Sequence, residues 1–450
     1  MRYLLSFVFV LSGTSLLAQN NYTLSLDEAI SQAIEQNLGL QVEKKNVTIA
    51  ENSATKGNAG LLPSVGINSG YEYSNTNNEL TIANTNNENG PPQEVSGTGV
   101  GTENINASVA VNYNLFDGFR GKYTFQQLEA RRLLSDLQYK ARVESTLLQV
   151  IAGYIDVARQ KEQLQVAEEA IQLSSDRLQR AEGQFQYGNT NKLAVLQAQV
   201  DLDNDSVAYR DAELKLANAK RNLNRLMGQE LNTDYEVNTT VNYLNDLVYD
   251  ELLQEALANN TALGLTKQGR QLAEYDLGVA QSGRYPTIQL TGQYGYNRQE
   301  TDFGLLLLQQ NLGFTGGVSL RYNLFNGGQT QTRIENAQLA IEQQQIAVKD
   351  TRQQLENQLL NAFATYENNK KQLQAERENL STFEENFERA QEDYRLGLIS
   401  ATDLRASQLN LTRAKNRIIT FTYNTKLSEV ELLQISGRLI QNAESDTKTE

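Results

Sequence analysis

The chain has 450 residues and a net charge of −14, and it contains no Cys, His or Trp. It can therefore hold neither a disulfide nor a lipidated N-terminal Cys, and it lacks the most common general base and zinc ligand. We therefore expect no enzyme, cofactor or metal site. The negative charge argues against nucleic acid as a partner. A hydrophobic content of 39% predicts either a thin core or a core that is completed by assembly.

The first residues have the pattern of a secretory signal peptide. Arg2 supplies a positive charge, an apolar run extends from Tyr3 to Leu11, and Ser15 to Ala18 form a cleavage site. The run is too short to cross a bilayer. We therefore expect residues 1–18 to be removed on export.

The next segment begins with a capping box. Ser25 is the expected N-cap and Glu28 the residue that reaches back to it. Apolar residues then recur at helical spacing, so the pattern predicts one helix to about Gly57.

Beyond Pro63 the hydrophobic period changes to two, which indicates strands. Four strands are expected, at about residues 63–75, 103–116, 286–298 and 313–325. Between the first two lies an insert from Asn75 to Asn104, rich in Asn, Thr and Gly, which predicts a mobile polar loop.

Each strand pair is followed by a long segment with a seven-residue apolar repeat, which indicates a helix in a coiled-coil seam. Val143, Val150 and Val157 begin the first series, and Leu359 and Tyr366 begin the second. Gly188 and Gly397 interrupt these segments, and a return helix follows each. The sequence therefore predicts two antiparallel helical hairpins, at residues 119–228 and 328–437.

These elements form a tandem duplication. The phrase Tyr-Asn-Leu-Phe-Asp-Gly at residues 113–118 returns as Tyr-Asn-Leu-Phe-Asn-Gly at 322–327, and the same shift pairs Gly188 with Gly397 and Gly228 with Gly437. A second shift pairs Asn37 with Asn260 upstream. We assign copies at 19–228 and 248–437, a linker at 229–247 and a polar tail at 438–450.

Strands with one apolar face suit a membrane barrel, but four strands cannot close one, because an open edge in lipid leaves backbone groups unpaired. Two chains would supply eight strands and three would supply twelve. A soluble sandwich edge is the alternative for the strands, and an isolated two-helix coiled coil is the alternative for the hairpins. An aromatic girdle against lipid is expected at Tyr71, Tyr73, Phe116, Tyr294, Tyr296 and Phe325.

The duplicated order of helix, two strands, long helix, glycine turn and return helix resembles the TolC family of outer-membrane efflux channels. The paired phrase at the strand ends and the segment from Tyr394 to Leu404 carry the resemblance. It implies a mainly α-helical fold with a transmembrane β part: a homotrimer with one twelve-stranded β-barrel in the outer membrane and an α-helical tunnel in the periplasm. It also implies a periplasmic adaptor and an inner-membrane pump as partners, in efflux or type I secretion of small molecules or proteins.

The resemblance also implies site residues. Asp403 and Tyr394 match a periplasmic gate, and the tips at Gly188, Asn189, Gly397, Leu398 and Ile399 would contact the adaptor. Two positions depart from the family pattern, because Ala406 and Ala194 stand where acids are found. For Asp403 the alternative is a carboxylate that only favours the start of a helix, and for Tyr394 it is a heptad core position.

Two further functions stay open at this stage. The chain could be a structural or adhesive coiled-coil stalk without channel activity, or a periplasmic adaptor, although an adaptor would lack the alternating strand pairs. The sequence names no cargo.

Overall fold

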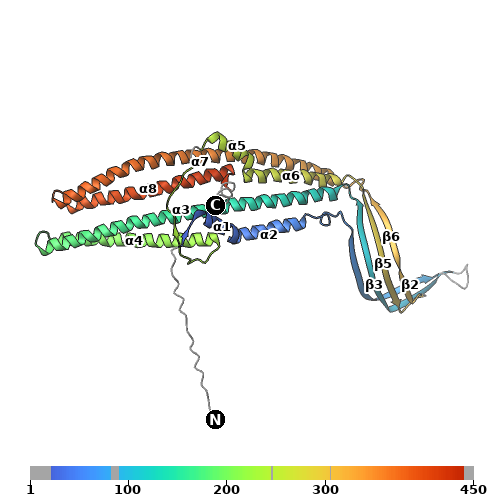
Figure 1. The fold of residues 1–450 in the computed structure, drawn as a ribbon. Coiled ribbons are helices and arrows are strands. Elements are labelled where there is room, and N and C mark those ends of the chain that lie inside the picture. The colour runs from blue at the N-terminus through green and yellow to red at the C-terminus, as the bar shows by residue number, and fades with distance from the viewer. Residues whose placement is uncertain (1–21, 83–90, 245–246, 305, 440–450) are drawn as a thin grey trace, which may run out of the picture. The chain divides into compact units, whose positions relative to one another are not determined.

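The two sequence repeats fold into the same series of elements in a computed structural model of the chain (Figure 1). The long helices α3 (Arg120–Gln186) and α7 (Gln329–Arg395) both have 67 residues. The return helices α4 (Lys192–Met227) and α8 (Ala401–Ser436) both have 36 residues. The duplication is thus confirmed in the secondary structure.

The structure describes residues 22–82, 91–244, 247–304 and 306–439. The predicted signal peptide and most of the polar tail lie outside these ranges. Two compact units are described separately. The tip unit contains the chain up to residue 41, residues 142–259 and the chain from residue 356, and the sheet unit contains residues 42–141 and 260–355.

The predicted single helix near the N-terminus is wrong, because the chain forms two helices, α1 (Leu26–Gln36) and α2 (Leu38–Ser53). The capping box of Ser25 and Glu28 at the start of α1 is confirmed. Asn37 separates the helices with an extended backbone, and its side chain accepts from Leu40 N at 3.2 Å. Its repeat equivalent Asn260 separates α5 (Tyr249–Asn259) from α6 (Thr261–Ser282) with the same geometry. An Asn can cap a new helix in this way, which helical spacing alone does not reveal.

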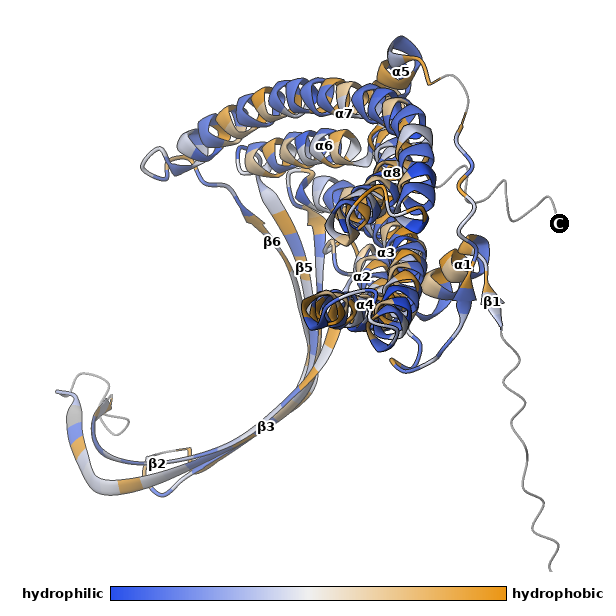
Figure 2. Cartoon of the chain, turned by 90° about the vertical axis from the view of Figure 1, so that its left-hand side faces the viewer, coloured by the Kyte–Doolittle hydropathy of each residue, from blue (hydrophilic) through white to orange (hydrophobic). Residues whose placement is uncertain are grey.

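The sheet unit contains one antiparallel sheet in the order β2 (Ser64–Ile82), β3 (Gln93–Phe116), β5 (Thr287–Thr301), β6 (Leu308–Arg321). Its register gathers apolar side chains on one face, in rows such as Ile67, Val109, Tyr294 and Phe314. The next row along the strands, whose side chains point to the opposite face, contains Asn68, Ser108, Gly295 and Gly313. Figure 2 shows apolar and polar segments interspersed along these strands. The alternation predicted for the strands is confirmed.

The predicted loop from Asn75 to Asn104 is wrong for most of its length. Strands β2 and β3 stay paired as far as Ile82 and Gln93, with a register shift between Thr76 and Asn78. The Asn- and Thr-rich sequence hid this extension, since a strand with two polar faces has no hydropathy alternation. Residues 83–90 lie outside the described residues.

The two copies of the six-residue phrase take different conformations. In the first copy, a bulge between Asn114 and Phe116 pairs Phe116 with Ile288, on the apolar face of the sheet. In the second, β6 ends at Arg321, so the strand predicted to residue 325 is too long. Arg321, the last residue of β6, pairs with Thr287, the first residue of β5 after Pro286.

The bulge is followed by the left-handed residue Phe119 (φ 68°), whose ring packs edge-on against Phe116 and Tyr285. Its repeat equivalent is Gly328, also at positive φ. The first copy thus has an aromatic residue at this left-handed position, whereas the second copy has glycine, which adopts a positive φ without steric cost.

In the tip unit, the heptad positions Val150, Val157, Leu359 and Tyr366 are buried, which confirms the heptad pattern there, whereas Val143 is half-buried. The main core of this unit is formed by α1, α3, α4 and α8 together with a short parallel pair, β1 (Thr23–Leu24) and β4 (Glu236–Val237). Tyr154 links the two strands of this pair, because its hydroxyl donates to Leu24 O and accepts from Asn238 N. Among the described residues, no helix combines the length and apolar character needed to cross a membrane.

Candidate functional site: the hairpin tips

The two hairpin tips have the same backbone. Gly188 (φ 75°) and Gly397 (φ 74°) take the left-handed conformation that ends a helix. Asn189 N donates to Gln184 O and Leu398 N donates to Asp393 O, both at 2.8 Å. Asn189 and Leu398 are exposed, whereas Ile399 is half-buried. The predicted tip residues therefore lie at the turns themselves.

The first residues of the return helices differ. In α4, Asn191 is the N-cap and accepts from Ala194 N at 3.0 Å. In α8, Ser400 is the N-cap and Asp403 completes a capping box, with Asp403 Oδ2 3.1 Å from Ser400 N and 2.7 Å from Ser400 Oγ. These hydrogen bonds from Ser400, the hydroxyl first and the backbone N–H second, lower the pKa of the Asp403 carboxyl. Asp403 is thus an exposed, ionised cap within the single chain.

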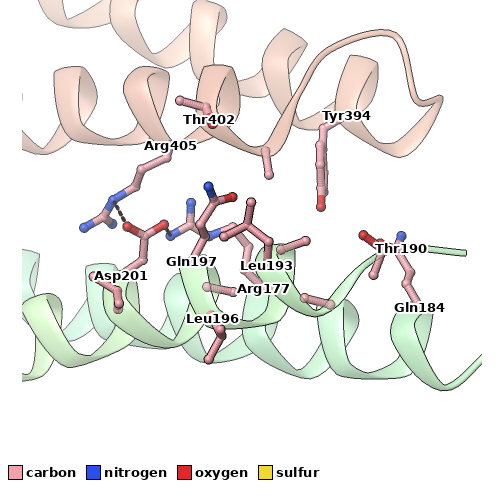
Figure 3. Close-up of a pocket in the computed structure, with 15 residues that line it drawn as sticks. Arg177, Gln184, Thr190, Leu193, Leu196, Gln197, Asp201, Tyr394, Thr402 and Arg405 are labelled. Atoms are coloured by element: carbon pink, nitrogen blue, oxygen red, sulfur yellow. Dashed lines mark ion pairs between the residues drawn. The ribbon is translucent and has the colours of Figure 1, made fainter. Parts of the chain in front are cut away.

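Tyr394 extends from α7 toward the α3–α4 hairpin (Figure 3). It is half-buried and lines a cavity of about 640 Å³ between the two hairpins. Apolar Leu193 and charged Arg177, Asp201 and Arg405 also line this cavity. Tyr394 therefore occupies the last heptad position of α7 and faces a cavity at the same time.

Beside this cavity, a buried ion-pair network joins the two hairpins. Arg405 of α8 donates two hydrogen bonds to Asp205 of α4, with Nη1–Oδ2 at 2.6 Å and Nη2–Oδ1 at 2.8 Å. Asp201 is 3.5 Å from Arg405 Nε and 3.4 Å from Arg177 Nη2. Ser174 Oγ donates to Asp205 and accepts from Arg177. The side chains of Arg405 and Asp205 are only 12% and 11% exposed.

Burial lowers the pKa of both arginines, but their net pKa shifts have opposite directions. Burial lowers the pKa of Arg177, which Asp201 only partly offsets. Burial is also the largest single influence on Arg405, but the hydrogen bonds to Asp205 and the negative charges of Asp205 and Asp201 together raise its pKa. Both guanidinium groups stay charged at neutral pH. A bidentate, nearly buried pair of this kind fixes one geometry between the helices that carry it.

The sequence analysis missed this network. A signal was present, because Asp201 and Asp205 stand four residues apart on one face of α4, where like charges destabilise a helix unless a cation compensates them. The cation could not be located, since Arg405 lies in the other repeat.

Most of the predicted girdle residues in the sheet lie toward the two ends of the apolar face, and Tyr294 lies one row further in than Tyr296. Phe116 lies beside Ile288 at the end nearest the helices, and Tyr71 and Tyr73 lie in the rows beyond Tyr296. Tyr294 lies within the apolar rows, opposite Val109 and Phe314. Phe325 follows the end of β6 and is 85% exposed.

Comparison with known proteins agrees with this architecture. The model of the family described as "Outer membrane efflux protein" matches residues 29–229 and 252–438. The chain is 21% identical to the outer membrane protein TolC of Vibrio cholerae over 441 residues, covering 96% of this chain and 95% of that protein. It is 20% identical to the cation efflux system protein CusC of Escherichia coli over 363 residues, covering 77% of this chain and 78% of that one.

Two solved structures share the fold. The CmeC outer membrane channel of Campylobacter jejuni superimposes with a TM-score of 0.74 at 17% identity, covering 94% of this chain and 88% of that one. The outer membrane protein VceC of Vibrio cholerae gives a TM-score of 0.72 at 16% identity, covering 92% and 96%. With both repeats matched by one family model, the chain belongs to the outer membrane efflux protein family and is a protein of the outer membrane.

Proposed function

We propose that the chain is the outer-membrane channel of a tripartite export system, a passive duct for small molecules or proteins delivered by an inner-membrane pump. The sheet carries this proposal. From Ile288 to Tyr296 its apolar face spans nine residues of β5 before Arg298 interrupts it, and a membrane-crossing strand needs about 9–11 residues. An apolar face of this length suits lipid on one side and a polar lumen on the other.

The open edges of the sheet support a trimer. Within the described residues β2 and β6 are the edge strands. In lipid each unpaired backbone group costs several kcal/mol, so the edges must pair with other strands. Three copies would give twelve strands, and the twelve-stranded barrel follows from the family likeness together with this closure. The helical hairpins would then form a tunnel on the periplasmic side.

The tips support a docking role at the periplasmic end. Gly188, Asn189, Gly397, Leu398 and Ile399 lie at turns that project from the helices, and an adaptor protein that contacts them would connect the duct to its pump. Because the residues around the two turns differ, the adaptor would bind each turn differently.

Asp403 and Tyr394 are proposed as the periplasmic gate. Three chains would bring three copies of each to one axis. A ring of carboxylates favours cations in a pore. The capping box does not compete with this role, because it fixes the Asp403 carboxylate in its charged form at the first turn of α8.

The proposal is tested in cells that lack this protein. Loss of the duct should raise the accumulation of fluorescent pump substrates, or stop the release of a type I secreted protein, and the two assays separate efflux from secretion. Re-expression of the full chain should restore the lost activity. If neither accumulation nor release changes in the deletion strain, the chain is the alternative, a structural stalk without channel activity.

A further inference from the structure

The polar face of the sheet is uncharged over most of its length. From Asn104 to Asn112 on β3, from Thr291 to Gln299 on β5 and from Gln309 to Gly317 on β6, the side chains on this face are amides, hydroxyls, Ala or Gly. The chain as a whole has a net charge of −14. This face therefore presents a neutral wall of hydrogen-bonding groups within an otherwise acidic protein.

A hollow of about 510 Å³ lies on the polar face, over the paired glycines Gly295 and Gly313. A Cβ at Gly295 would lie 2.8 Å from Ser108 Cβ and 3.4 Å from Gln293 Nε2, so a side chain here would displace its neighbours. Nothing lies within 4 Å of a Cβ added at Gly313, so the hollow is open above this residue. Its volume falls within the roughly 300–1,000 Å³ of ligand pockets.

Four polar side chains surround the two glycines. Gln293 and Asn297 flank the glycine of β5, and Asn311 and Thr315 flank the glycine of β6. They share the glycines' face, because residues two apart on a strand point the same way. Asn297 Nδ2 donates to Asn104 Oδ1 at 2.9 Å, whereas Gln293, Asn311 and Thr315 are exposed. Amide and hydroxyl groups both donate and accept hydrogen bonds without carrying charge.

We propose that this hollow binds a neutral saccharide. The hydroxyl groups of a sugar also donate and accept, so they match the surrounding amides and the Thr315 hydroxyl. None of the described residues that line the hollow is charged, so the hollow has no group that would favour an ion. The inference rests on the proposed function, because it takes the polar face as the lumen wall, and it specifies one class of molecule that the duct would hold.

The backbone around the hollow argues against an extended peptide as the ligand. Strand β5 is paired with β3 on one side and with β6 on the other, so its N–H and C=O groups are used within the sheet. Peptides that bind sheets add to an exposed edge through main-chain hydrogen bonds. Recognition at this hollow therefore falls to side chains, which favours a ligand rich in hydroxyl groups.

Binding at this hollow would be weak and rapidly reversible. Over the three strand segments that form the neutral wall, no side chain on the polar face is aromatic, so a sugar would gain little apolar contact there. A weak site suits a transport path, because the cargo must leave the site as well as enter it.

Saturation-transfer NMR tests the site, with maltotriose as the probe and the purified full chain in a detergent that has no sugar headgroup. We expect saturation to reach the sugar. Gly313→Val should abolish this transfer, because its methyl groups fill the hollow. Gly317→Val is the matched control, on the same strand and face, and nothing lies within 4 Å of its added Cβ either. Asn311→Leu should weaken binding about fivefold, the loss expected for one neutral hydrogen bond.

Two further probes separate saccharide binding from its alternatives. Polyethylene glycol of similar length accepts hydrogen bonds but hardly donates them, and it should receive little saturation. Equal transfer to it, equal loss in both Val variants, or no transfer to maltotriose would overturn the site. Stronger transfer to capped triglycine would overturn the saccharide in favour of a peptide.

Planar bilayers separate this result from the proposed function. In the natural protein, maltotriose should interrupt the ion current, and Gly313→Val should remove the interruptions while Gly317→Val keeps them. A conducting protein that maltotriose never interrupts and does not bind would retain the duct and overturn the site. Maltotriose binding that only Gly313→Val abolishes, in a protein that conducts no current, would support the site and overturn the duct.

Discussion

The two hairpin tips have one backbone and two sets of side chains. Both turn at a left-handed glycine with the same hydrogen bonds, and both return helices begin at a capped residue. Yet the first hairpin contributes Asp201 and Asp205 to the ion-pair network and the second contributes Arg405. Outside this network, the exposed Asp403 at the start of α8 has Ala194 as its repeat equivalent. The comparison teaches that duplication preserved the features set by local geometry and let the surfaces between hairpins diverge.

The largest effect is expected where the tips differ most. Arg405→Ala should lower the free energy of unfolding by about 3 kcal/mol, because it leaves Asp205 nearly buried without its cation. Thermal melting in detergent, followed by far-UV circular dichroism, measures the loss. Arg389→Ala, which removes an exposed pair with Glu385, is the control and should cost less than about 1 kcal/mol.

A double replacement sharpens this prediction. Arg405→Leu/Asp205→Ala gives the contact between α8 and α4 the residues found at the equivalent positions of the repeat, Leu196 and Ala414. The double variant should lose less free energy of unfolding than Arg405→Ala alone, because it leaves neither Arg405 nor Asp205 buried without its partner. Strictly additive losses would show that the two side chains do not interact.

A smaller and equal effect is expected at the turns. Gly188→Ala and Gly397→Ala should each lower stability by about 1 kcal/mol, because both residues have positive φ and nothing lies within 4 Å of the added Cβ. Gly228→Ala is the informative contrast, because its added Cβ would clash with the backbone oxygen of Gln36 and the substitution should cost more. Melting curves of the three variants compare them. Unequal losses at the two tips would contradict the shared backbone.

The caps should differ in pH dependence. Asn191→Ala and Ser400→Ala should each cost about 1 kcal/mol at neutral pH. The pKa of Asp403 is lowered in the folded chain, so its stabilisation is complete above the ordinary aspartate pKa and is lost as pH falls below it. The difference between Ser400→Ala and the natural protein should therefore shrink in acid. The Asn191→Ala difference should stay constant, and melting from pH 6 to pH 2.5 compares them.

The smallest structural change is expected from Asp403→Asn, at the proposed periplasmic gate. Asp403→Asn removes a charge and keeps an acceptor for the cap, so the trimer should assemble normally. If three copies face one axis, cation selectivity and block by divalent ions should both weaken. Reversal potentials in planar bilayers measure this, with Glu384→Gln, an exposed acid on α7, as control. An unchanged reversal potential and unchanged block would remove Asp403 from the gate.

The sequence predicted the features that depend on local geometry and missed those that depend on contacts between distant parts of the chain. The tip glycines, the Ser25 cap, the heptads and the alternating strand faces depend on neighbouring residues, and all were found. The break at Asn37 was missed because an Asn at that point either continues a helix or caps a new one. The extension of β2 and β3 was missed because two polar faces leave no alternation.

Contacts between the repeats were out of reach of local patterns. The Arg405–Asp205 pair joins residues 200 positions apart, and only the fold brings them together. The different ends of β3 and β6 likewise depend on where β5 begins, not on their shared six-residue phrase.

Conductance in a planar lipid bilayer tests the central claim, that this chain forms a duct, most directly. The purified full-length protein is added to one side of the membrane, and current is recorded at fixed voltage. We predict discrete current steps of uniform size as single assemblies insert, with cations favoured. Stable insertion without any current, at every voltage that the bilayer withstands, would contradict the duct and favour the stalk.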